Sequence, residues 1–194
     1  MIRLRRLILS ALHTGLATAL CAAPLYADTN VDFTATVQKD TCQIELNGDG
    51  VVNLATVGLG YFADGITAES DYDGGKEFTI KLISCPVSGG ENTNVTFEFI
   101  PQSGQLAAGN QQVFANDKPV STGGASNVGV VIFNSNSPRT NVLNTDGSSR
   151  ATFTAESYND TIWTFYARMQ KILSTSSVST GEVLSRVIVS VKYQ

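Results

Sequence analysis

Two stretches of the chain carry residue types that could bind a cofactor or a metal ion. The first contains Gly58, Gly60 and Ala63, which match the G-x-G-x-x-A pattern of dinucleotide-binding proteins. That pattern binds pyrophosphate only where a helix begins at it and directs backbone amides toward the phosphates. The residues that follow are DGITAESDYDGG, which cannot continue a helix of useful length. We therefore predict that no cofactor binds here.

The second stretch is acidic and contains Glu69, Asp71, Asp73 and Glu77. Its residues 71–74, DYDG, open like a calcium loop, but the remaining ligand positions of a twelve-residue loop are not filled. Acidic turns are common on solvated surfaces, and we interpret this stretch in that way. No metal site is predicted.

Residues 1–27 have the pattern of a secretory signal peptide. Three arginines precede an apolar run over residues 7–23, and the small residue Ala27 follows. The run is shorter than a membrane span, and no stop-transfer pattern comes after it. We expect cleavage after Ala27 and export, which leaves a chain of suitable length for one domain with a sizeable core.

Cleavage changes both the charge and the possible chemistry. The formal net charge moves from −4 to −7, because three arginines are removed, and an acidic surface without a basic cluster argues against binding to nucleic acid or anionic membranes. His13, the only histidine, is also lost, which excludes catalytic sets that need a histidine base. A glycosidase-type carboxylate pair stays open, although nothing in the sequence indicates one. We predict no enzymatic activity and no small-molecule substrate.

The mature chain keeps two of its three cysteines, Cys42 and Cys85, because Cys21 leaves with the signal peptide. An even pair in an exported protein predicts one disulfide.

The elements that position these residues are predicted to be strands. Short segments with an apolar residue at every second position recur along the chain, with turns between them. Residues 58–75 are expected to form a loop with one short helical turn near Phe62, and residues 101–127 a turn-rich stretch. Many short strands without an amphipathic helix favour one all-β sandwich. The predicted strands are residues 31–37, 43–46, 51–57, 76–84, 94–100, 127–133, 151–155, 161–169 and 181–194.

Two of these strands have distinctive patterns. Residues 127–133, NVGVVIF, form a nearly continuous apolar run, which is typical of a strand buried on both faces. In residues 181–194 the apolar side chains share one parity, which predicts a half-buried strand. No later segment can pair with the far edge of that final strand, and an uncovered apolar edge promotes aggregation. Either it is an ordinary final strand paired inside its own sheet, or something else covers the edge. The residues of shared parity are Val183, Val187, Val189, Val191 and Tyr193.

Both ends of the mature chain resemble pilus (fimbrial) subunits of the chaperone-usher pathway. Gly181 lies fourteen residues from the end and Tyr193 is penultimate, as in the C-terminal signature of that family. Ahead of Cys42, the alternating residues are similar to the family's N-terminal donor strand. The family usually has glycine where this chain has Ala35, which leaves the identity of the accepting subunit open. The donor-strand residues in this resemblance are Val31, Phe33, Ala35 and Val37.

The resemblance implies an immunoglobulin-like sandwich that lacks its final strand and is completed in trans by a donor strand. Residues 28–41 would be the donor-strand extension and residues 42–194 the pilin domain. The final strand would border the acceptor groove and contact the chaperone. The family's disulfide would join Cys42 to Cys85. The groove residues in this interpretation are Gly181, Val187, Val189, Val191 and Tyr193.

The function implied is that of a structural subunit of a surface pilus, which mediates cell adhesion as part of the fimbria. The implied partners are a periplasmic chaperone, an outer-membrane usher and neighbouring subunits. The arm ahead of Val31 is very short, which favours a minor tip or adaptor subunit. The alternatives are a major rod subunit and, with less support from a one-domain chain, a sugar-binding adhesin.

Overall fold

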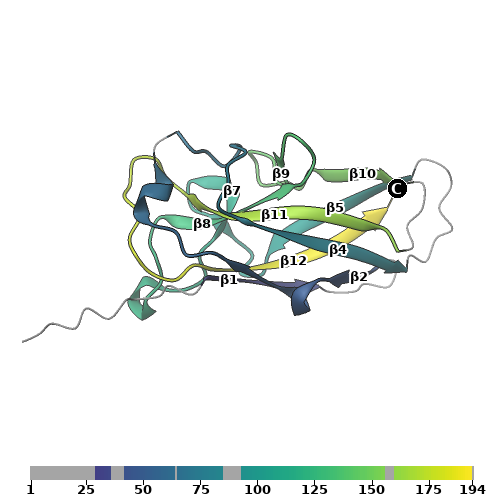
Figure 1. Cartoon of the computed structure of the whole chain (residues 1–194), viewed down its shortest axis with the longest axis horizontal. Helices are drawn as coiled ribbons and strands as arrows, with labels where there is room; N and C mark the ends of the chain where they lie inside the picture. Colours follow the sequence, from purple (N-terminus) through teal and green to yellow (C-terminus); the bar gives the residue numbers. More distant parts are fainter. Residues whose placement is uncertain (1–28, 36–41, 64, 85–92, 156–159, 194) are drawn as a thin grey trace, which may run out of the picture.

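The structure is a computed structural model that describes residues 29–35, 42–63, 65–84, 93–155 and 160–193. Two β-sheets pack face to face in a sandwich (Figure 1). The first sheet contains, in spatial order, β10 (Ala151–Ala155), β5 (Thr93–Pro101), β12 (Leu184–Tyr193), β1 (Thr29–Ala35) and β3 (Val51–Leu54). The second contains β2 (Gln43–Leu46), β4 (Lys76–Ser84), β11 (Ile162–Lys171), β8 (Val128–Asn134), β7 (Asn110–Ala115) and β6 (Leu106–Ala107), with β9 (Thr140–Asn141) paired to β8.

The described helical segments are three short 3-10 turns, and none of them is long or apolar enough to cross a bilayer. They are η1 (Gly48–Gly50), η2 (Leu59–Phe62) and η3 (Val120–Thr122). The prediction of an all-β, immunoglobulin-like sandwich is confirmed, and η2 is the helical turn expected near Phe62. The strands β2, β4 and β10 have the bounds predicted from the sequence.

An aromatic cluster fills the space between the two sheets. The ring of Phe165 on β11 lies 5.3 Å from that of Phe97 and 5.1 Å from that of Phe99, both on β5. Phe78 on β4 stacks on the same ring at 5.7 Å. Edge-to-face and offset contacts of this kind add to the stability from apolar burial, so this cluster joins the two sheets.

A second, smaller core covers the outer face of the second sheet, beneath the segment that precedes β4. Ala68 from this segment packs with Val113, Val131, Phe133 and Tyr166. Because apolar groups cover both faces of β8, its residues from Val128 to Phe133 are all buried, as the continuous apolar run predicted. The same two-sided burial explains why β7 was not predicted: its buried neighbours Val113 and Phe114 enter different cores, so no alternation is visible.

Candidate assembly site

The C-terminal strand β12 has the two-faced pattern that its sequence predicts. Val183, just before β12, and Val187, Val189 and Val191 within it are buried in the main core. The outward Lys192 donates to Glu98 of β5 at 2.7 Å. On this side β12 pairs antiparallel with β5, from Val187 opposite Pro101 to Tyr193 opposite Val95.

The other edge of β12 is covered by β1, the chain's own N-terminal strand (Figure 1). β1 runs parallel to β12, with Asn30 opposite Leu184 and Ala35 opposite Val189. It also pairs antiparallel with β3, from Thr29 opposite Leu54 to Asp32 opposite Val51. The gap expected beside β12 is therefore not seen in the described residues, because one strand of this chain fills it.

The register explains why this strand suits the position. Val31, Phe33 and Ala35 stand opposite Ser185, Val187 and Val189, which are all buried. The residues predicted to alternate in a donor strand thus pair in register with buried residues of β12. The fourth predicted donor residue, Val37, lies outside the described residues.

Gly181 precedes β12 at a point where two backbones nearly touch. Its φ is +148°, and a Cβ built on it would lie 2.5 Å from the amide nitrogen of Ala125. The adjacent Glu182 donates its amide to the Gly123 carbonyl at 2.9 Å and accepts from the Ala125 amide at 2.8 Å. Glycine is needed at this position for both its conformation and its lack of a side chain.

Two polar residues after β7, which sequence reasoning missed, fix the first residues of β12. Asn116 accepts from the Leu184 amide at 2.8 Å and donates to the Glu182 carbonyl at 2.9 Å. Asp117 accepts from the Arg186 amide at 2.9 Å. The antiparallel ladder with β5 begins only at Val187, so these side chains satisfy backbone groups that precede it.

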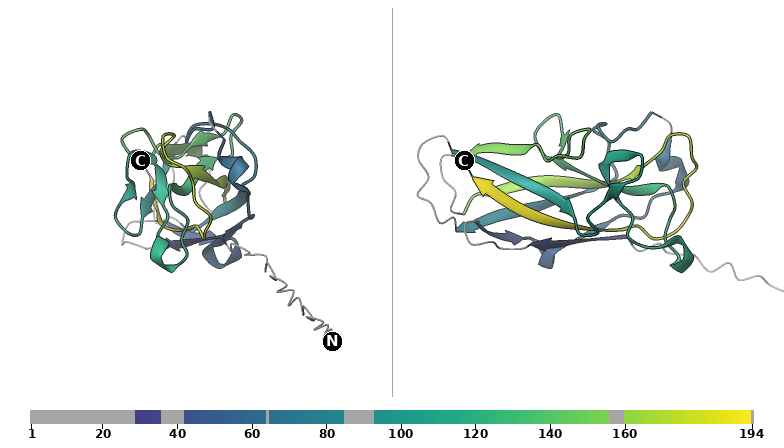
Figure 2. Two further views of the ribbon diagram at one scale, coloured as in Figure 1. Left: turned by 90° about the vertical axis from the view of Figure 1, so that its left-hand side faces the viewer. Right: turned by 180° about the vertical axis from the view of Figure 1, so that it is seen from behind.

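A cavity of about 560 Å³ opens at the end of the sandwich where β12 begins. The cavity lies just beyond the first residues of β1, which pair with Leu54 on one side and Leu184 on the other. Its lining includes Thr56 and Val57, which follow Leu54, and Glu182 and Val183, which precede Leu184. η2, η3 and the segment before β12 gather at this end of the molecule (Figure 2). Most of the wall is apolar and includes Val57, Leu59, Phe62, Ala125, Val128, Met169, Val178 and Val183.

In the structure, the stretch that matches the dinucleotide pattern contains a short 3-10 turn, and the acidic stretch forms ion pairs. Gly58 precedes η2 and Gly60 lies within it, and η2 is a single four-residue turn that ends at Phe62. In the acidic stretch, Arg139 pairs with Asp71 at 2.9 Å and lies within 4.0 Å of Glu77. These carboxylates therefore belong to an ion-pair group rather than to a purely solvated turn.

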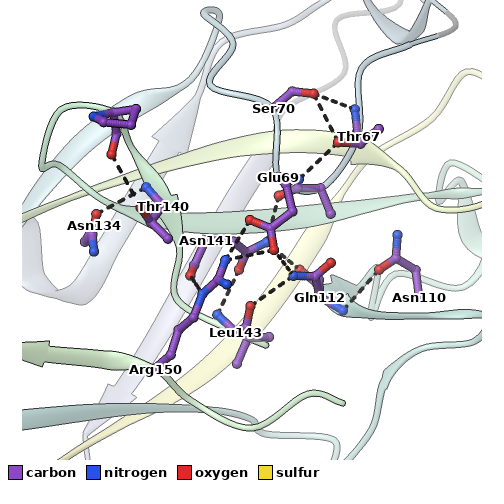
Figure 3. A network of polar contacts seen from close by, with 12 residues as sticks. Thr67, Glu69, Ser70, Asn110, Gln112, Asn134, Thr140, Asn141, Leu143 and Arg150 are labelled. Atoms are coloured by element: carbon purple, nitrogen blue, oxygen red, sulfur yellow. Dashed lines mark hydrogen bonds and ion pairs between the residues drawn. The ribbon is translucent and has the colours of Figure 1, made fainter. Parts of the chain in front are cut away.

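Glu69 belongs to a separate polar network on the outer face of the second sheet (Figure 3). Arg150 donates to both Glu69 carboxylate oxygens, at 2.6 and 2.8 Å, and to the Asn141 carbonyl at 2.6 Å. The buried Asn141 donates to the Ala68 carbonyl at 2.8 Å, and Gln112 donates to Glu69 and to the Leu143 carbonyl. This network fastens the segment before β4 to the sheet.

The predicted disulfide has support from the strand register. Cys42 is buried just before β2, and the next residue, Gln43, pairs with Ser84 at the end of β4. The two cysteines are the chain neighbours of this pair. Cys85 itself lies outside the described residues, so the disulfide stays a prediction.

Comparison with known proteins agrees with this geometry at both ends of the chain. A family model described as fimbrial protein matches residues 31–194, which include β12 and all but the first two residues of β1. The chain is also similar to the uncharacterized fimbrial-like protein YadK of Escherichia coli (strain K12), with 41% identity over 179 residues that cover 89% of each protein. The match thus includes the terminal strands as well as the core between them. This chain belongs to the fimbrial protein family.

Proposed function

We propose that this chain is a structural pilus subunit that joins its neighbours by donor-strand exchange. The observation that carries the proposal is the position of β1, which lies inside a sheet between β12 and β3 although it is the first strand of the chain. β1 adds to the edge of β12, and β-strand addition is a common mode of peptide recognition. The corresponding strand of another subunit can occupy the same position if β1 leaves.

The pairing of β1 leaves room for a better partner. Within the described residues, β1 pairs with β12 from Leu184 to Val189. It is also parallel to β12, and parallel pairs are slightly less stable per residue than antiparallel ones. The sheets of an immunoglobulin-like sandwich are antiparallel, so an incoming strand that completes this fold runs antiparallel to β12. Such a strand has the more stable orientation against β12.

The cavity at the start of β12 offers a place where exchange begins. It lies beyond Thr29, the first residue of β1, so an incoming side chain can enter it while β1 is still bound. An antiparallel incoming strand brings its C-terminal part to this end, where the residue corresponding to Val37 would stand. Burial of a valine side chain there would stabilise the joint by about 1.5–3 kcal/mol.

The remaining elements of the proposed function are supported by family membership and by the sequence. The proposed route is export to the periplasm, capture by a chaperone at the edge of β12, and transfer at an outer-membrane usher to the surface fimbrium, where the subunit takes part in adhesion. The short arm ahead of Val31 favours a minor tip or adaptor position over a major rod position. Immunoelectron microscopy separates these two, since label at the fibre end supports the former and label along the shaft the latter.

Deletion of residues 28–41 tests strand exchange. We expect the shortened chain to need an added donor peptide or the chaperone to stay soluble, because the edge of β12 is then uncovered. It should also be unable to join the subunit ahead of it. A shortened chain that unfolds cooperatively as a soluble monomer and takes up no peptide would refute the proposal.

A further inference from the structure

We propose that Arg168 is a positioning residue for strand exchange, which holds one wall of the cavity at the start of β12 in the shape that selects the incoming side chain. This inference rests on the exchange function proposed above. It concerns how selectivity at the cavity is maintained by a residue that does not line it.

Arg168 fastens the segment before β4 from beneath. Its side chain on β11 is fully buried, and Nη2 donates to the carbonyls of Thr67 at 2.8 Å and Ser70 at 2.9 Å. Nη1 donates to Oε1 of Gln170 at 2.5 Å, and that residue's Nε2 donates to the Ile66 carbonyl at 2.9 Å. One guanidinium and its neighbour thus bind three carbonyl oxygens of residues 66–70.

The chemistry of a guanidinium suits this role. Arginine presents five donors in a planar fork, so one side chain can bind several carbonyl groups that no strand pairs. Within the described residues, Arg168 has no carboxylate within ion-pair distance, and its guanidinium lies 5.2 Å from the Phe133 ring. Burial accordingly lowers the pKa of Arg168. A smaller side chain, or one that donates hydrogen bonds in only one direction, cannot make all of these contacts.

Tyr61 connects the fastened segment to the cavity wall. Its hydroxyl donates to the Asp73 carbonyl at 3.0 Å, and its ring lies 5.4 Å from that of Tyr72. On the other side its ring meets Phe62 edge to face at 5.2 Å, and Phe62 lines the cavity together with Leu59. The positive charge of Arg168 also acts on Tyr61, since it partly opposes the rise in the Tyr61 pKa that burial causes.

The opposite wall is set by the residue next to Arg168. Met169 follows it on β11 and therefore points to the other face of the sheet, where it lines the cavity. Residues 168 and 169 thus fix the distance between the wall at Phe62 and the wall at Met169. If the guanidinium is lost, the segment at 66–70 loosens, Phe62 shifts, and the cavity no longer distinguishes incoming side chains by size.

The test measures peptide selectivity in the full exported chain. A fluorescent peptide with the sequence of residues 28–39 and its Val37→Ala and Val31→Ala versions are added, and uptake rates are followed by anisotropy. In the unchanged protein we expect Val37→Ala to slow uptake on the order of tenfold, because two methyl groups are missing from the cavity. In the Arg168→Met protein, the ratio of the uptake rate of the unchanged peptide to that of the Val37→Ala peptide should fall to roughly threefold or less. The Val31→Ala ratio, which reports on the far end of β12, should not change.

Two further variants separate positioning from stability. Leu82→Val loosens the core at a buried position away from the cavity and should keep the Val37 ratio of the unchanged protein. Tyr61→Phe removes the bond to Asp73 and should lower the ratio in part, and it carries the test if Arg168→Met does not fold.

The outcomes distinguish this inference from the function on which it rests. Failure of the unchanged protein to take up any peptide refutes strand exchange and this inference together. Uptake in the unchanged protein, with an equal Val37 ratio in Arg168→Met and Tyr61→Phe, refutes the positioning role alone. A ratio that falls equally in Leu82→Val also overturns it, because general loosening would then explain the effect.

Discussion

Replacing Gly181 by alanine tests whether the close backbone contact ahead of β12 stabilises the fold. The new Cβ would lie 2.5 Å from Ala125 N, 2.6 Å from Gly124 C and 2.7 Å from Gly123 O. All three are backbone atoms, so the contact cannot be relieved by rotating a side chain. The two segments must separate.

The expected loss of stability has two contributions. The positive φ of Gly181 costs about 1–3 kcal/mol when a side chain is present. Separation also breaks the two hydrogen bonds of Glu182 with Gly123 and Ala125, each worth about 1 kcal/mol. We therefore expect Gly181→Ala to lower the free energy of unfolding by about 3–5 kcal/mol.

Gly104→Ala provides a matched control. Gly104 also has a positive φ, +77°, but a Cβ there meets no atom within 4 Å. The control should therefore show only the conformational cost of about 1–2 kcal/mol. Urea-induced unfolding of both purified variants, with linear extrapolation, gives the comparison. A Gly181→Ala protein no less stable than Gly104→Ala would refute the close-contact explanation.

The two terminal strands should respond differently to a buried charge. Val189→Asp places a carboxylate in the chain's own core and should abolish folding and chaperone capture. Phe33→Asp should preserve chaperone capture and remove the subunit from pilus polymer ladders. Loss of chaperone capture in both variants would identify β1 as an ordinary core strand. Burial raises the pKa of Tyr61 from 10.0 to about 12, so the stability linked to its neutral hydroxyl is complete below pH 10 and is lost as the pH rises through about 12. Denaturation curves over this range should show a smaller loss in Tyr61→Phe. Mass spectrometry under non-reducing conditions should find Cys42 and Cys85 joined, and two alkylatable thiols in the native protein would contradict this.

The elements that the sequence predicts well are strands with one buried face and one more exposed face. In β12, Val187 and Val189 alternate with more exposed residues, and this contrast locates the strand and its inward face. In β7, Val113 and Phe114 are adjacent and both buried, so the period-two signal is absent and the sequence predicts turns there. Burial on both faces is a property of the whole sandwich, and a local pattern reports it only when the apolar run is as long as in β8.

The candidate site was predicted only in part for a similar reason. Glycine at position 181 and the parity of β12 could be recognised from the chain itself. The bonds from Asn116 and Asp117 to β12 join residues nearly seventy positions apart, and no local pattern indicates them. The position of β1 in this chain's own sheet also depends on long-range pairing, which its local alternation does not specify.

The direction of β12 has a mechanical consequence for a fibre built from such subunits. β12 extends along the long axis of the molecule (Figure 1). In the proposed joint, a donor strand paired along β12 would be loaded lengthwise when the fibre is pulled, so its backbone hydrogen bonds would resist in shear, many at once, instead of opening one after another. Six residues, 36–41, separate β1 from Cys42 and can span at most about 25 Å, so in the proposed joint they would be a short tether between adjacent subunits. Tension would therefore reach the hydrogen-bond ladder between the donor strand and β12 with little slack. A non-covalent joint loaded in this direction would withstand forces that separate two strands whose hydrogen bonds open one after another.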